Sequence, residues 1–363
     1  MPAITSASVH AFYLFDVAQA IDLGKVRARL GTSASAATLQ DKSAGPGKVG
    51  YFVPAVVADG SALKVGEIAG FRVQVKWFDY GVISLRLSRP FSGSWDELVR
   101  LGQELCESEP LEQQATTACG LVVEAVRDAL VGLRASFLSE DYLAFVVHAC
   151  DRPVSAEAML VEHGAEIAQL LRGERQTLSR QERDEVLRHA LSYLTDDLVI
   201  PAYNASFVLD TAPASMATLE ILEFVNSQLL EFRYHDELLE TELTRIYSAL
   251  QAPRWTDRYV GRRPTRAARQ LHALFVDVNE LTDRMENAVK LVGDIYAARL
   301  FGLAATRLGL EAWKRNVQDK LRTLDAIYRF SVEQTGMSQG NLLELVIVLI
   351  LVLEFGMLLA GLQ

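Results

Sequence analysis

The residues best suited to binding chemistry are arginines that lie between positions 254 and 269. They are interleaved with Trp255 and Tyr259, and they comprise Arg254, Arg258, Arg262, Arg263, Arg266 and Arg269. A guanidinium fork suits phosphate, and neighbouring aromatic rings can stack on nucleic-acid bases. The same cluster would be attracted to anionic lipid headgroups. The commonest structure for such a segment is a solvated loop that pairs with acidic residues elsewhere. The sequence leaves these three alternatives open.

Two glycine motifs match catalytic or cofactor-binding patterns by letter only. GPGKVG at 45–50 fits the dinucleotide-binding GxGxxG, but a polar loop precedes it and a strand-like stretch follows, whereas the motif requires a strand before and a helix after. GMSQG at 336–340 fits GxSxG, but it joins a helix to an apolar tail. The histidines lack HExxH spacing. We therefore predict no catalytic residue, no metal site and no cofactor.

A polar run lies inside a predicted helix, from Glu231 to Glu237. Arg233 and Glu237 are four residues apart, as are Glu231 and His235. Side chains at this spacing lie on one face of a helix, so we expect pairing along the helix surface. A metal or proton-relay site built on His235 is the less common alternative.

The stretch from 342 to 362, LLELVIVLILVLEFGMLLAGL, is strongly apolar and contains no Lys or Arg. As a helix it would extend about 30 Å, which is roughly the thickness of the hydrocarbon core of a bilayer. Glu344 and Glu354 would be intramembrane polar residues, and Glu354 is easier to bury against its copy in another subunit. The sequence therefore predicts a C-terminal transmembrane helix that acts as a tail anchor. The alternative is a helix buried in a soluble oligomer.

The net charge and the positions of basic residues limit the expected location of the protein and its expected partners. The 363 residues carry a net charge of −10, which argues against a protein that coats nucleic acid over its whole surface. Basic residues between Lys314 and Arg329 precede the apolar stretch, so the positive-inside rule places the bulk of the chain in the cytoplasm. No Lys or Arg occurs before Lys25, which does not fit a secretory signal or a transit peptide. We expect a single-pass protein of the inner, cytoplasmic membrane.

The elements that would position these residues form three regions. Alternation of apolar and polar residues predicts a half-buried hairpin of 71–78 and 82–87, and Ser94 is a candidate cap for a helix that starts near Trp95. Helices are expected near 95–107, 111–136, 155–173 and 180–194, with strands at 142–148 and 198–208. We predict an α+β domain over 1–212, a helical region over 213–340 and a membrane helix over 341–363.

The helical region shows apolar residues at three- and four-residue spacing. One series runs from Leu271 to Val292 and another from Leu310 to Leu324. This spacing is typical of a long antiparallel helical hairpin or coiled coil. With the mixed N-terminal region and the C-terminal membrane helix, the expected fold class is therefore α+β with a helical hairpin.

Several blocks of sequence, taken in order, resemble the "required for meiotic nuclear division" family, which has a YagE-like domain of unknown function. The blocks are FRVQVKWFDYGVISL (71–85), SYLTDDLVIPAYNASFVLD (192–210), LLEFRYHDELLETEL (229–243), GDIYAARL (293–300), LEAWKRNVQDKLRTLDAIY (310–328) and LLELVIVLILVLEFG (342–356). The resemblance implies a bacterial-type member with a membrane helix. Mitochondrial relatives in that family support organelle translation. It implies no catalytic site.

The resulting hypothesis is a non-enzymatic, membrane-tethered scaffold or assembly factor on the cytoplasmic face. It would self-associate through its helical region as a homo-oligomer, and it would contact the membrane through 342–362. The alternative is a membrane-linked RNA- or ribosome-binding factor that uses the arginines of 254–269. No small-molecule substrate is expected.

Overall fold

The computed structural model describes residues 3–36, 55–251, 295–327 and 329, together with 276, 278–280 and 282–283. The chain divides into two compact units, each built from two segments. The first unit comprises Met1–Tyr234 and Leu281–Lys314, and the second comprises His235–Glu280 and Arg315–Gln363. Helix α6, Ala212–Gln251, contributes residues to both units.

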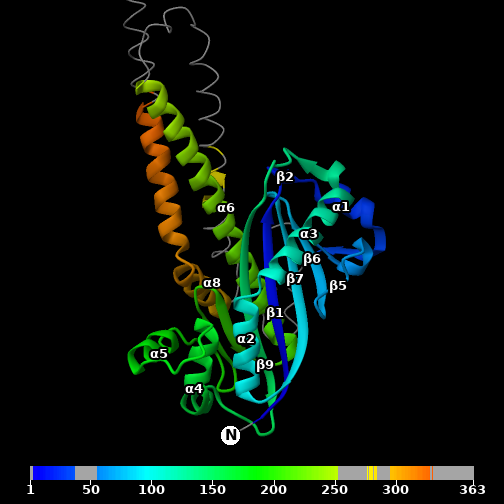
Figure 1. The fold of residues 1–363 in the computed structure, drawn as a ribbon, viewed down its shortest axis with the longest axis vertical. Coiled ribbons are helices and arrows are strands. Elements are labelled where there is room, and N and C mark those ends of the chain that lie inside the picture. The colour runs from blue at the N-terminus through cyan, green and yellow to red at the C-terminus, as the bar shows by residue number, and fades with distance from the viewer. Residues whose placement is uncertain are drawn as a thin grey trace, which may run out of the picture. The chain divides into compact units, whose positions relative to one another are not determined.

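The first unit contains a nine-stranded sheet within its described residues (Figure 1). The strand order is β10-β11-β9-β1-β7-β6-β4-β3, and β5 pairs with β6 outside this path. Neighbours are antiparallel, except that β11 and β9 are parallel. The strands are β1 (Ile4–Asp16), β3 (Ala34–Ala36), β4 (Ala55–Asp59), β5 (Glu67–Ile68), β6 (Phe71–Phe78), β7 (Val82–Gly93), β9 (Leu138–Cys150), β10 (Leu198–Pro201) and β11 (Ala205–Leu209). A separate pair joins β2 (Ala20–Ile21) to β8 (Leu130–Val131).

The hairpin predicted from alternating residues is confirmed as β6 and β7. Its turn depends on Gly81, which has a φ of +99° and whose added Cβ would lie 1.9 Å from the carbonyl oxygen of Ala18. A side chain at this position would be strained by its backbone angle and would collide with that carbonyl. The turn sets the register in which Val75 lies opposite Leu85.

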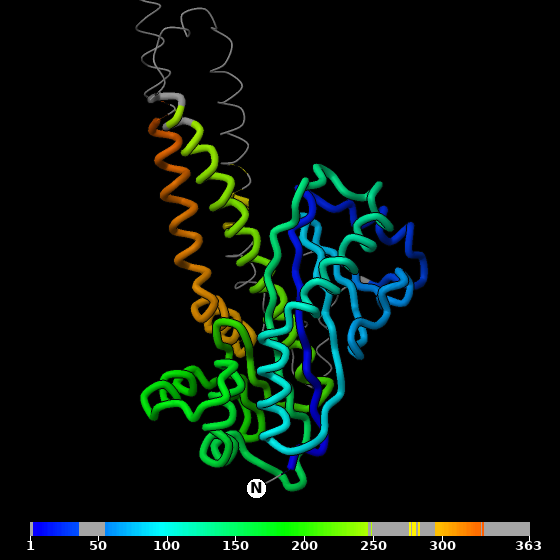
Figure 2. The backbone as a smooth tube through the Cα atoms, viewed as in Figure 1, coloured from blue at the N-terminus to red at the C-terminus, as the bar shows by residue number. Residues whose placement is uncertain are grey.

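One face of the sheet is covered by helices of the first three-fifths of the chain, which Figure 2 traces in blue to green. These helices are α1 (Leu23–Leu30), α2 (Trp95–Cys106), α3 (Glu109–Ala125) and α4 (Ala156–Arg172), and α5 (Arg180–Leu187) packs on α4. Alternate strand residues such as Val73, Val75 and Trp77 point into this layer and are fully buried in one hydrophobic core. Ser94 caps α2 through a capping box with Glu97, as its position before Trp95 predicted.

The opposite face of the sheet is covered by the first half of α6, and α8 (Ile295–Arg307) packs near β10. The alternation in β6 predicted a half-buried strand, with Gln74 and Lys76 on its polar side. In the structure Lys76 is only 3% exposed, because α6 lies over it. The polar side of this strand is therefore a buried polar face.

The predicted C-terminal membrane helix is corrected by the structure. The described residues form a mixed sheet with helices, and none of their helices combines the length and the apolar composition needed to cross a bilayer. The longest of them, α6, carries charged side chains along its length, including Glu220, Glu223 and Glu231. The predicted segment, 342–362, with Glu344 and Glu354, lies outside the described residues. The tail anchor and the inner-membrane location are withdrawn with the fold class that contained them.

Candidate functional site

The predicted basic cluster lies outside the part of the chain that the structure describes. This applies to Arg254, Trp255, Arg258, Tyr259, Arg262, Arg263, Arg266 and Arg269, and to the glycine motifs at 45–50 and 336–340. Its assignment to phosphate, nucleic acid or lipid stays a prediction.

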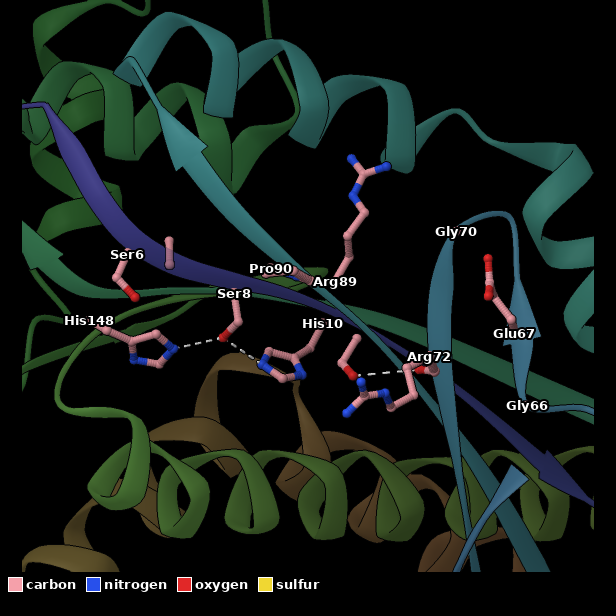
Figure 3. Close-up of a pocket in the computed structure, with 12 residues that line it drawn as sticks. Ser6, Ser8, His10, Gly66, Glu67, Gly70, Arg72, Arg89, Pro90 and His148 are labelled. Atoms are coloured by element: carbon pink, nitrogen blue, oxygen red, sulfur yellow. Dashed lines mark hydrogen bonds between the residues drawn. The ribbon is translucent and has the colours of Figure 1, made fainter. Parts of the chain in front are cut away.

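A row of polar side chains crosses four neighbouring strands on the sheet face that α6 covers (Figure 3). His148 comes from β9, Ser8 and His10 from β1, Ser88 from β7 and Arg72 from β6. The register places His10 opposite Ser88 and Ser88 opposite Arg72. Because side chains alternate between the faces of a strand, Ser8 and His10 share one face while Val9 points to the core. The antiparallel pairing of β1 with β9 then brings His148 next to Ser8.

Ser8 links the two histidines by hydrogen bonds. Its Oγ lies 2.9 Å from Nε2 of His10 and 2.9 Å from Nε2 of His148. The other ring nitrogen of His148, Nδ1, lies 3.0 Å from the carbonyl oxygen of Asp210, two residues before α6 begins. The chain of contacts therefore runs from the start of α6 across β9 and Ser8 to His10.

His10 is electrically neutral in the folded protein. Burial, the largest cause, acts together with the positive charge of Arg86 and the neighbouring His148 to lower its pKa to about 3. Only 7% of its surface is exposed, and its Nδ1 has no hydrogen-bond partner. A buried polar atom of this kind needs a hydrogen-bond partner, which a water molecule or a ligand can supply.

A cavity of about 600 Å³ adjoins this row of side chains. Arg72 extends its guanidinium toward His10, whereas Arg89 points to the other side of the sheet (Figure 3). Arg89 stacks on the ring of Phe71, with 4.8 Å between the guanidinium carbon and the ring centroid. Neither guanidinium pairs with a carboxylate of the described residues, and Glu67 is the acidic residue among those that line the cavity. The histidine side of the cavity is therefore suited to a small anion.

A buried charge cluster adjoins the cavity and fixes α6 to the sheet. Nζ of Lys76 lies 2.6 Å from Oε2 of Glu223 and also pairs with Glu220. Arg86 Nη1 lies 3.1 Å from Oε1 of Glu220 and also donates to Gln74. Burial opposes the ionisation of Glu223, but Lys76 and Arg86 outweigh it and hold its pKa below the usual value. The two cations and two carboxylates compensate one another.

Further polar contacts continue along the first half of α6. The hydroxyl groups of Tyr80 and Ser227 lie 2.6 Å apart, and Arg233 pairs with Glu140 of β9. The sequence predicted that Arg233 would pair with Glu237 on the helix surface. This prediction is wrong for Arg233, because its guanidinium pairs with Glu140 of β9 instead.

The second unit contains a different kind of contact, between the C-terminal half of α6 and the helical residues 315–327. Nζ of Lys320 lies 3.0 Å from Oδ1 of Asp236 and 2.7 Å from Oε2 of Glu240. Apolar residues in the same segments are buried, namely Leu239, Leu243, Val317, Leu321 and Leu324. Their spacing of three and four residues matches the apolar seam of a coiled coil.

The histidine–serine–histidine chain matches no metal or nucleophile motif of short spacing, so the sequence did not predict it. Ser8 and His148 are 140 residues apart, so no local motif links them. The available signal was that both lie in predictable strands, with Ser8 and His10 on one face. Which strands are neighbours was not encoded in that local pattern.

Comparison with known proteins identifies the family. The family model described as "Uncharacterized protein MJ0711, N-terminal domain" matches residues 6–216. The uncharacterized protein MJ0711 of Methanocaldococcus jannaschii is 24% identical over 204 residues, which cover 56% of this chain and 62% of that protein. The chain thus aligns with less than two thirds of the relative's length. No solved structure matches the chain.

The chain belongs to the MJ0711 N-terminal domain family, because the matched residues make up more than half of it. This finding corrects the resemblance to the "required for meiotic nuclear division" family. The blocks quoted for that resemblance were short, and three of them, 229–243, 310–328 and 342–356, include the helical seam or the apolar tail. Apolar helices of similar spacing recur in unrelated proteins, so such blocks do not distinguish one family from another.

Proposed function

We propose that this member of the MJ0711 N-terminal domain family is a non-enzymatic assembly protein that self-associates through its helical unit. The observation that carries the proposal is the seam of the second unit, where Lys320 bridges Asp236 and Glu240 beside buried leucines. Apolar seams flanked by ion pairs are the means by which helices select and hold helical partners. The proposal no longer includes a membrane tether.

Within its described residues, the second unit buries a small apolar core, which consists of the seam and Val278. Isolated helices gain most of their stability from packing an amphipathic face, and a single pair buries only one stripe of each helix. Association with a second copy would extend the buried seam. Lys320 supports the register of the seam, since the two carboxylates outweigh its partial burial and raise its pKa.

The test is the mass of the purified full chain in solution, measured by light scattering after size-exclusion chromatography. Leu321 is 4% exposed, so we expect Leu321→Glu to shift the protein to monomer by placing a charge in the seam. Thr323→Glu is the matched control, because it adds the same charge at an exposed position two residues away. A monomeric wild-type chain, or equal masses for wild type and both variants, would overturn the proposal.

The basic segment of 254–269 supports a second candidate function, which is binding of RNA or the ribosome. Arginines with interleaved aromatic rings are suited to this role. Replacing Arg262, Arg263 and Arg266 by Glu should abolish RNA binding and leave the oligomer intact. Binding to a short RNA should also weaken steeply with salt. RNA binding that is unchanged in the triple variant would exclude this candidate.

A further inference from the structure

The directions of the hydrogen bonds around Ser8 follow from the one group that can only accept. The carbonyl oxygen of Asp210 accepts from Nδ1 of His148, so this nitrogen carries the hydrogen. In the neutral imidazole, Nε2 of His148 then accepts, and the hydroxyl of Ser8 donates to it. The Oγ of Ser8 in turn accepts from Nε2–H of His10. The second nitrogen of His10 is therefore left with a lone pair and no hydrogen.

This lone pair has no hydrogen-bond donor among the described residues. Nδ1 of His10 is buried, has no hydrogen-bond partner, and belongs to a ring that lies between Ser8 and the guanidinium of Arg72 (Figure 3). Buried acceptors nearly always receive a hydrogen bond. The cavity therefore offers an acceptor at His10 next to a cation at Arg72. A ligand that satisfies both must present a donor and a negative charge.

Chemistry narrows the ligand further. An anion whose oxygens carry no hydrogen would bind Arg72 but would place its own lone pairs against the lone pair of His10. Monohydrogen phosphate has one O–H group that can donate to His10, and it keeps negatively charged oxygens for Arg72. Sulfate has the same tetrahedral shape and no hydrogen. Phosphate and sulfate therefore differ in whether they can donate a hydrogen bond to Nδ1 of His10, which is the property that distinguishes them at this site.

We propose that the cavity beside His10 and Arg72 is a binding site for a small oxyanion that carries its own proton, of which monohydrogen phosphate is the simplest. This goes beyond the assembly function and does not depend on it, since the site lies wholly within the first unit. Ser8 acts as the positioning residue, because its hydrogen bond with Nε2 fixes Nδ1 as the unprotonated nitrogen of His10.

The experiment is a calorimetric titration of the full chain with inorganic phosphate and, separately, with sulfate. It is done at about pH 8, above the ordinary histidine pKa of about 6.5, so that free imidazoles are neutral. We expect saturable binding of one phosphate and binding of sulfate that is weaker by about tenfold or more, the effect of one hydrogen bond to a charged group. No saturable phosphate binding, or equal affinity for the two anions, overturns the proposal.

Two arginines provide a matched pair of variants. Arg72→Gln should weaken phosphate binding by about tenfold or more, because a charge-assisted contact is lost. Arg89→Gln should leave it within about twofold, because Arg89 lines the same cavity but points away from His10. Equal losses in the two variants would mean a diffuse electrostatic effect and would contradict the proposal.

The variant Ser8→Ala tests the hydrogen-bond chain without replacing a buried ring. It removes the group that fixes the tautomer of His10, so His10 becomes free to present either a lone pair or an N–H group. We expect the preference for phosphate over sulfate to fall toward parity while Arg72 still supports binding of both. A preference that is unchanged in Ser8→Ala would show that the chain does not select the ligand, and the proposal would be wrong.

Discussion

The two faces of the central sheet are built by different rules, although they share the same strands. On the face under α2 and α3, Val73, Val75 and Trp77 are fully buried in a continuous apolar core. On the face under α6, Lys76 and Arg86 are almost as deeply buried, but they meet carboxylates of the helix. Strand β6 thus contributes apolar packing to one side and charge pairing to the other.

The difference shows how the fold separates stability from specificity. Apolar burial is non-directional, so the first face stabilises the sheet without dictating how a helix lies on it. Buried charges tolerate few arrangements, because each must meet its partner or remain unpaired at high cost. The second face therefore positions α6 and leaves the buried acceptor of His10 and the exposed guanidinium of Arg72 for a ligand.

The largest effect is expected from the apolar face. Trp77→Ala should lower the free energy of unfolding by about 3–5 kcal/mol, because a fully buried ring is replaced by a cavity. Trp77→Phe should lose clearly less, since it keeps most of the packing. Chemical denaturation monitored by circular dichroism measures both. A loss below about 1 kcal/mol for Trp77→Ala would mean that this face does not dominate stability.

The charge cluster gives the next effect. Lys76→Met should cost about 3 kcal/mol, because Glu223 is left buried without its nearest cation while Arg86 still pairs with Glu220. The double variant Lys76→Met with Glu223→Leu should recover much of this loss, because both charges are removed together. The same denaturation experiment compares them. If the double variant is as unstable as the single one, Lys76 contributes by packing and not by charge.

Local patterns predicted the elements of the fold better than their ends or their neighbours. The hairpin and the start of α2 followed from alternation and from Ser94, which are properties of adjacent residues. Helix α3 was predicted to continue to residue 136 but ends at Ala125, where a short 3₁₀ turn leads into β8. That strand pairs with β2, a contact with distant residues that no local propensity encodes.

Local patterns could not predict the polar site either, because it also depends on contacts between residues that are distant in the sequence. Ser8 and His148 meet only because β1 pairs with β9, and Arg72 joins them only through β7. Alternation predicted that Lys76 faces solvent, but α6 covers it in the structure. Alternation identified which residues share a face, but the covering of that face depends on long-range packing.

A smaller effect is expected from the titration of His10. Its pKa of about 3 in the folded state lies below the ordinary histidine pKa of 6.5, so the unfolded chain binds more protons between these values. This contribution to stability is complete above pH 6.5 and is lost as the pH falls, by about 1.4 kcal/mol for each pH unit.

The variant His10→Gln does not titrate and should lack that slope. Urea denaturation at two pH values, about one unit apart below 6.5, should show the wild type losing about 1.4 kcal/mol more than the variant. The pKa of Asp16 is raised to about 6 by burial, against the effect of Arg134, so its contribution has the opposite sign. It is common to both proteins and cancels in the difference. Parallel pH profiles would show that His10 is not held neutral.

The smallest change in stability is expected at the exposed end of the polar face. Arg72 is exposed, and its guanidinium makes no hydrogen bond or ion pair with the described residues, so Arg72→Gln should alter the free energy of unfolding by no more than about 0.5 kcal/mol. Arg86→Gln, 6% exposed and paired with Glu220, should cost several times more. Chemical denaturation of the two variants compares these losses and shows which arginine the fold requires. If Arg72→Gln is as destabilising as Arg86→Gln, the charged packing under α6 extends to Arg72, and that residue serves the fold instead of a ligand.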